Sequence, residues 1–84
     1  YERDTVTISL HQDAALPCDA FFADCESIFR DHGGRPHWGK IHTRTADELA
    51  ALYPMWQRFG ALRRELDPGH AFLNQHLHAL FAAA

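Results

Sequence analysis

The sequence predicts an α+β chain that is mostly helical, with one strand followed by three to four helices. Two observations lead to this fold class. Residues 5–11 alternate polar and apolar side chains, whereas residues 17–32 and 45–81 carry apolar side chains at helical spacing. The 84 residues allow one small domain, and a chain of this size buries only about 60–65% of its unfolded surface. We therefore expect a fragment that packs against more protein.

The strand is expected over residues 4–11. Val6, Ile8 and Leu10 would lie on one face, and the intervening residues are polar and partly β-branched. A single strand cannot satisfy its own backbone N–H and C=O groups, and no other segment has a clear strand pattern. Together with the absence of an initiator Met, this indicates a piece of a longer protein; the alternative is a processed or tagged small protein.

The first helix is expected over residues 17–32. Pro17 suits the first turn of a helix, and Gly33 suits the position after its end. Cys18 and Cys25 lie in this segment, and seven helical residues separate their Cα atoms by about 10 Å, which is too far for a disulfide. We interpret both as small buried apolar residues in a reducing compartment.

The remaining helices are expected over residues 45–81. Thr45 and Glu48 have the spacing of a capping box, which predicts a helix start. Pro54 interrupts the apolar stripe and predicts a break near Tyr53. The segment 67–69, Asp-Pro-Gly, predicts a turn, after which a last short helix is expected over 70–81.

Composition excludes several classes of function. The formal charge is −3 and no basic stripe is visible, which argues against a nucleic-acid module. No window approaches the roughly 18 apolar residues of a membrane span. The seven histidines are scattered and no pair has a zinc-site spacing, so no metal ligands are predicted.

The loop predicted over residues 33–44 has the most unusual chemistry of the chain. Lys40, the one lysine, follows Trp38 and Gly39 in this glycine-rich loop, with two histidines and Arg35 nearby in the sequence. A compact cation on a glycine-rich loop would suit an anionic group. The alternative is a surface loop with Trp38 as a packing anchor, and composition alone favours that alternative.

The order of the motifs resembles one family. The motifs are Gly33-Gly34-Arg35-Pro36-His37-Trp38-Gly39-Lys40, Leu52-Tyr53-Pro54, Leu66-Asp67-Pro68 and Phe72-Leu73-Asn74. This set resembles the C-terminal region of the D-arabinono-1,4-lactone, L-gulonolactone and alditol oxidases, FAD-linked enzymes of the vanillyl-alcohol-oxidase class. The resemblance covers residues 5–81.

The resemblance implies a larger FAD-dependent oxidase that oxidises a CH–OH group of a sugar lactone or alditol, with oxygen as acceptor. The FAD-binding domain is absent from these 84 residues, so the chain alone is expected to be inactive. The strand at 4–11 would belong to an antiparallel cap sheet. A free-standing helical interaction module without catalysis is the alternative.

The resemblance also implies roles for residues of the loop. Lys40 would be the catalytic cation at the pyrimidine end of the flavin, where it would stabilise the negative charge of the reduced ring. His37 and Asn74 would join Lys40 in binding the cofactor. Arg35, Trp38 and His42 would shape the substrate site or the loop.

The implied partners are the remainder of the same polypeptide, with its FAD and cap domains, and a small sugar lactone or polyol. Nucleic acid is not expected. The location is expected to be cytoplasmic. Peripheral membrane association and a homo-oligomer through the unpaired strand are left open.

Overall fold

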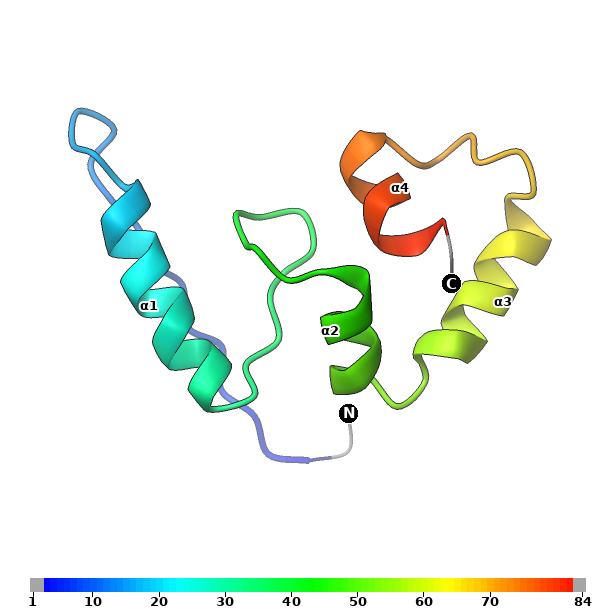
Figure 1. The fold of residues 1–84 in the computed structure, drawn as a ribbon, viewed down its shortest axis with the longest axis horizontal. Coiled ribbons are helices and arrows are strands. Elements are labelled where there is room, and N and C mark those ends of the chain that lie inside the picture. The colour runs from blue at the N-terminus through cyan, green and yellow to red at the C-terminus, as the bar shows by residue number, and fades with distance from the viewer. Residues whose placement is uncertain (1–2, 83–84) are drawn as a thin grey trace. The chain divides into compact units, whose positions relative to one another are not determined.

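The computed structural model describes residues 3–82. Tyr1, Glu2, Ala83 and Ala84, which include the start of the chain and the end of its alanine tail, lie outside the described residues. The described part holds four helices in the order α1 (Asp19–Asp31), α2 (Ala46–Leu52), α3 (Trp56–Leu66) and α4 (Gln75–Phe81) (Figure 1). The chain divides into two compact units, Tyr1–Gly34 and Arg35–Ala84.

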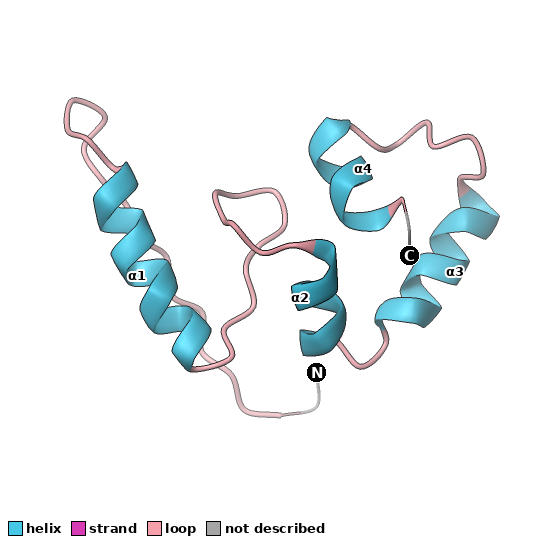
Figure 2. Ribbon diagram, in the orientation of Figure 1, coloured by secondary structure: helices cyan, strands magenta, loops and turns pink. Residues whose placement is uncertain are grey.

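The predicted α+β class is wrong, because no strand forms among residues 3–82 (Figure 2). Residues 4–11 have no regular structure, and Val6 and Ile8 are 85% and 60% exposed. Alternation is a local pattern, but a strand also needs a second strand to pair its backbone groups. The described residues offer none, so the cap-sheet strand is absent here.

Helix α1 ends in a glycine-dependent turn. Gly33 has a φ of 66°, and its N–H donates to the carbonyl of Arg30 at 3.1 Å. The N–H of Gly34 donates to the carbonyl of Phe29 at 2.7 Å, and a Cβ at Gly34 would lie 2.8 Å from that oxygen. These two bonds form a Schellman motif. Gly33 and Gly34, the first two glycines of the sequence motif at residues 33–40, therefore end α1.

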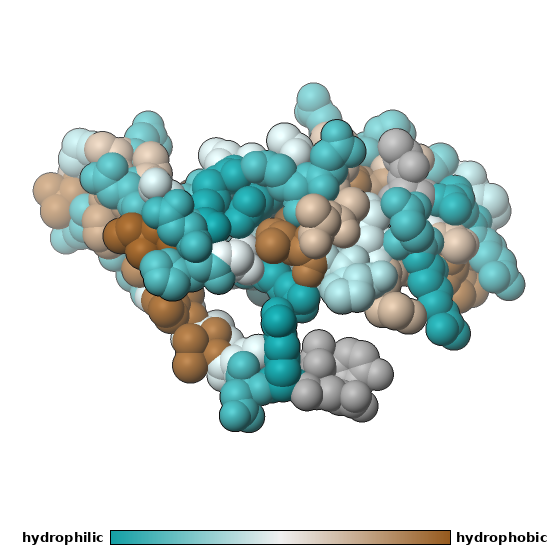
Figure 3. Space-filling model, turned by 60° about the horizontal axis from the view of Figure 1, so that its bottom comes forward, coloured by the Kyte–Doolittle hydropathy of each residue, from teal (hydrophilic) through white to brown (hydrophobic). Residues whose placement is uncertain are grey.

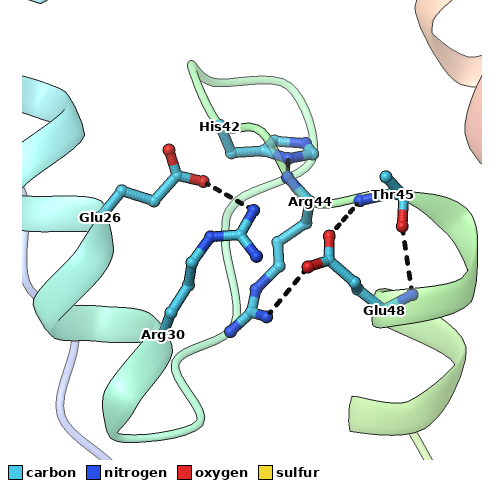
Figure 4. Close-up of polar contacts among 6 residues, drawn as sticks. All are labelled: Glu26, Arg30, His42, Arg44, Thr45 and Glu48. Carbon is cyan, nitrogen blue, oxygen red and sulfur yellow. Dashed lines mark hydrogen bonds and ion pairs between the residues drawn. The ribbon is translucent and has the colours of Figure 1, made fainter.

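Helix α1, in the N-terminal unit, has no buried residue. Cys18 is the N-cap residue and Cys25 lies within the helix; both are free thiols and half-buried. The sequence predicts that the cysteines are buried, and the structure shows them only half-buried. A salt bridge of 3.7 Å joins Glu26 to Arg30 one helical turn later (Figure 4).

Helix α2 begins at the predicted capping box and ends before the predicted proline. The N–H of Glu48 donates to the Thr45 hydroxyl at 3.4 Å, and the N–H of Thr45 donates to the Glu48 carboxylate at 2.8 Å (Figure 4). Tyr53 is extended, with φ −115° and ψ 106°, as expected for a residue before proline. The chain then turns and α3 starts at Trp56.

The last helix is shorter than the sequence predicts, because it begins at Gln75 instead of residue 70. Asn74 is its N-cap, and the side-chain oxygen accepts the N–H of Leu77 at 2.8 Å. His70, in the preceding turn, has a φ of 58°, which a continuing helix does not allow. The prediction that Asn74 lies inside the helix is therefore wrong.

The core of the C-terminal unit lies where α2, α3 and α4 meet (Figure 1). Its buried residues are Leu49, Trp56, Leu80 and Phe81. The apolar stripe predicted over 49–66 is only partly core, because Phe59, Leu62 and Leu66 are 42%, 52% and 74% exposed. Apolar residues reach the surface in several places on the face drawn in Figure 3. The two other helices of this unit, α2 and α4, leave that side of α3 exposed.

Candidate functional site

The indole of Trp38 anchors the loop at residues 35–44, hereafter the 35–44 loop, to the helical core. Its ring centroid lies 4.8 Å from that of Phe81, 5.6 Å from Phe59, 5.7 Å from Tyr53 and 6.1 Å from Trp56. Tilted and edge-on contacts at such distances are favourable between aromatic rings. Trp38 is thus the packing anchor that composition favours.

Two further hydrogen bonds hold the loop. The Arg35 guanidinium donates to the carbonyl of Leu52 at 2.7 Å and lies 4.4 Å from the centre of the Tyr53 ring. The carbonyl of Leu52 is at the end of α2, where no later helical N–H can reach it. On the other side, Nε2 of His76 in α4 donates to the carbonyl of Trp38 at 2.7 Å.

His37 and Lys40 form the two ends of a tight turn. The N–H of Lys40 donates to the carbonyl of His37 at 3.1 Å, and the N–H of Gly39 donates to Nδ1 of His37 at 3.1 Å. The second bond places the proton of a neutral His37 ring on Nε2, which stays a donor. Both side chains are exposed. No carboxylate pairs with Lys40 within residues 3–82.

The polar end of the loop is ordered by His42. Its Nδ1 accepts the N–H of Arg44 at 3.1 Å (Figure 4). Its ring centroid lies 5.4 Å from that of His76. Arg44 in turn makes a salt bridge of 3.8 Å with Glu48 at the start of α2. His42 is half-buried. The His42 ring therefore contacts α4 through His76, and Arg44 joins this part of the loop to α2.

The six predicted site residues occupy three kinds of position in the structure. Arg35, Trp38 and His42 hold the loop, whereas His37 and Lys40 are presented by it. Asn74 lies at the start of α4, where its oxygen is engaged in the cap. Sequence reasoning missed His76, because no short motif links it to Trp38, 38 residues earlier.

The turn from residue 67 to 74 carries its own polar network. Asp67 accepts the N–H groups of Phe72 at 3.1 Å and Ala71 at 2.8 Å. The bond from Phe72 contributes most to holding the pKa of the Asp67 carboxyl below its ordinary value; desolvation opposes it, and the bond from Ala71 adds to it. Arg63 donates to Nδ1 of His70 at 3.4 Å and adds a nearby positive charge.

A metal centre is not assembled in the described part of the chain, where no three His, Cys, Asp or Glu side chains come together. None of the described helices has the length and apolar character to cross a membrane.

Comparison with known proteins gives the family. A family model described as D-arabinono-1,4-lactone oxidase matches residues 1–80. The chain is 47% identical over 76 residues, or 90% of its length, to an L-gulono-1,4-lactone dehydrogenase of Mycobacterium tuberculosis. It is 52% identical over 82 residues, or 93% of its length, to an alditol oxidase of a Streptomyces species. No solved structure gives a significant match.

The chain belongs to the D-arabinono-1,4-lactone oxidase family, a family of oxidoreductases. The resemblance of the motif set to these enzymes is thereby confirmed. The chain is also similar to an L-gulonolactone oxidase of Bos taurus, with 46% identity over 56 residues, or 67% of this chain and 13% of that protein. The chain spans 18% and 19% of the length of the two relatives described above.

Proposed function

We propose that this chain is the part of an FAD-dependent oxidoreductase that presents Lys40 to the flavin, in an enzyme that oxidises a CH–OH group of a sugar lactone or an alditol. One observation carries the proposal most directly. Lys40 is an exposed cation without a carboxylate partner in the described chain, on a turn whose backbone is anchored by Trp38, Arg35 and His76.

The exposed groups of the turn fit the pyrimidine end of a flavin. That end carries carbonyl and nitrogen acceptors, and the turn offers an ammonium group at Lys40 and an Nε2–H donor at His37. Ile41, next to Lys40, is 78% exposed and provides an apolar surface for a ring. Bound FAD would supply the two-electron acceptor for the substrate hydride.

Under this proposal Lys40, His37 and Asn74 have different roles. The Lys40 ammonium stabilises negative charge beside it and orients substrate hydroxyl groups, and a site closed to water strengthens that effect. His37 donates a hydrogen bond to cofactor or substrate. Asn74 uses its oxygen to cap α4, so a contact with the cofactor would come from its amide nitrogen.

Oxygen is proposed as the acceptor that completes the cycle, so that each CH–OH group oxidised to C=O yields one H2O2. Relatives are named both oxidase and dehydrogenase. Oxygen uptake and H2O2 formation during turnover would identify an oxidase. Turnover with an artificial acceptor but not with oxygen would identify a dehydrogenase. A panel of sugar lactones and alditols would identify the substrate class in the same assay.

The role of Lys40 is tested in the full-length protein that carries this chain. In Lys40→Ala we expect anaerobic flavin reduction by substrate to slow by about 10²- to 10³-fold, because a charge-stabilising group is removed. The FAD content, read from the visible spectrum, should stay near normal. Arg58→Ala removes an exposed cation from α3 and is the matched control. Near-normal reduction in Lys40→Ala would refute the assignment.

A further inference from the structure

The hydrogen bond from His76 reaches the centre of the turn that presents Lys40. His37 and Lys40 are the first and fourth residues of this turn, which their backbone bond of 3.1 Å closes. The peptide between Trp38 and Gly39 is the central peptide. Its carbonyl accepts from Nε2 of His76 at 2.7 Å, and its N–H donates to Nδ1 of His37 at 3.1 Å.

The central peptide of such a turn has two accessible orientations. Turns of type I and type II differ by a rotation of about 180° of this peptide, and type II requires a positive φ at the third residue. Gly39 occupies that position and tolerates a positive φ at little cost. In the structure Gly39 does not have one, so the turn is of the type I kind. A flip would break the bonds to His76 and His37 together.

Hydrogen-bond chemistry fixes what His76 contributes. A carbonyl oxygen only accepts, so Nε2 of His76 carries the proton. The ring stands at 66° to that of His42, with the centroids 5.4 Å apart, which restricts its rotation. Helix α4 positions the donor, because Asn74 caps the helix two residues earlier. Helix α4 therefore holds the Nε2–H donor of His76 against the Trp38–Gly39 peptide, which Gly39 would otherwise allow to rotate.

We infer that His76 is a positioning residue for Lys40: it holds the Trp38–Gly39 peptide in one orientation and thereby fixes where the Lys40 ammonium is presented. This inference rests on the proposed role of Lys40. Indole packing holds Trp38 on the core but does not oppose rotation of the following peptide, which the bond from His76 opposes together with the weaker, local bond to Nδ1 of His37. Loss of the donor would leave a folded unit with a turn that samples both orientations.

The variants separate the donor from the ring. His76→Phe keeps an aromatic ring and removes the N–H, whereas His76→Gln keeps an N–H donor at similar reach. His78→Phe changes another exposed histidine of α4 and is the control. Gly39→Ala disfavours the flipped turn, and its Cβ would meet the His37 ring at 3.4 Å, an ordinary contact. It should therefore partly rescue His76→Phe.

The first measurement is amide hydrogen exchange at Gly39 in the full-length protein, which reports on the orientation of this peptide without depending on catalysis. We expect faster exchange there in His76→Phe, restored protection in His76→Gln, and no change in His78→Phe. Unchanged exchange in His76→Phe, or equal loss in His76→Gln, would overturn the inference.

The second measurement links the turn to Lys40. We expect flavin reduction to slow by about 10- to 100-fold in His76→Phe, since a displacement near 1 Å has effects of that order. In a Lys40→Ala background, adding His76→Phe should change the rate by less than about threefold. Equal slowing with and without Lys40 would overturn the inference. A normal rate in Lys40→Ala alone would instead refute the proposed function, and the exchange result would still stand.

Discussion

Single side chains in the C-terminal unit have distinct tasks that depend on their hydrogen bonds. Lys40 and His37 face outward from a turn, while the indole between them points into the core. In the turn before α4, the two carboxylate oxygens of Asp67 accept the N–H groups of Ala71 and Phe72. These bonds favour the charged carboxylate and so lower its pKa.

The lowered pKa of Asp67 predicts how stability depends on pH. A carboxyl whose pKa is lower in the folded state stabilises the fold above its ordinary pKa, here 3.8, and this contribution is lost as pH falls through the lowered value. We expect Asp67→Ala to be less stable than the parent chain by a constant amount between about pH 5 and 7.

The difference between Asp67→Ala and the parent should narrow below pH 3.8. Urea denaturation of both proteins across this range measures it. Asp24→Ala, which removes an exposed carboxylate of α1, is the control for the loss of a surface charge. A difference that stays constant down to the most acidic pH would contradict the assignment.

The helices of this chain owe their ends to local chemistry. The capping box at Thr45, the Schellman turn at Gly33 and the break at Pro54 all lie where the sequence predicts them. Each depends on residues within a few positions of one another. The strand predicted over 4–11 depended on a partner strand elsewhere, and in its absence the same alternation has no regular structure.

Because Asn74 caps α4, its substitution should lower the stability of the protein. Asn74→Ala removes the acceptor of the Leu77 N–H and should lower the free energy of unfolding by about 1 kcal/mol. Asn74→Ser keeps a capping oxygen and should recover most of this loss, as urea denaturation would measure.

The same pair of variants tests the proposed cofactor contact of Asn74. Serine lacks an amide nitrogen, so a weaker FAD affinity in Asn74→Ser at near-normal stability would support the contact. Unchanged FAD affinity in both variants would remove Asn74 from the cofactor site.

The stability of the C-terminal unit rests on a small core. Four buried residues, with Trp38, Ala50, Tyr53 and Leu77 packed against them, join α2, α3 and α4. Among residues 3–82, Leu49 is the one fully buried large side chain. A core of this size leaves little reserve, and the exposed apolar side of α3 adds nothing to it within the unit.

Substitution of Leu49 should therefore be severe. Leu49→Ala is expected to cost about 2–5 kcal/mol, because it leaves a cavity where the three helices meet. Leu66→Ala, at a side chain that is 74% exposed, is the matched control and should stay within about 0.5 kcal/mol. Denaturant unfolding followed by tryptophan fluorescence reports on the unit directly. Similar losses in the two variants would show that Leu49 is not central to the core.

The sequence by itself determined the family, the loop that carries Lys40, and the helix ends to within about two residues, except for the start of α4. Those properties depend on the order of motifs and on hydrogen bonds between near neighbours. Only the tertiary structure decided that Trp38 is an anchor, that His76 holds its carbonyl, and that residues 4–11 do not form a strand. These depend on contacts between residues far apart in the chain, which local spacing does not encode.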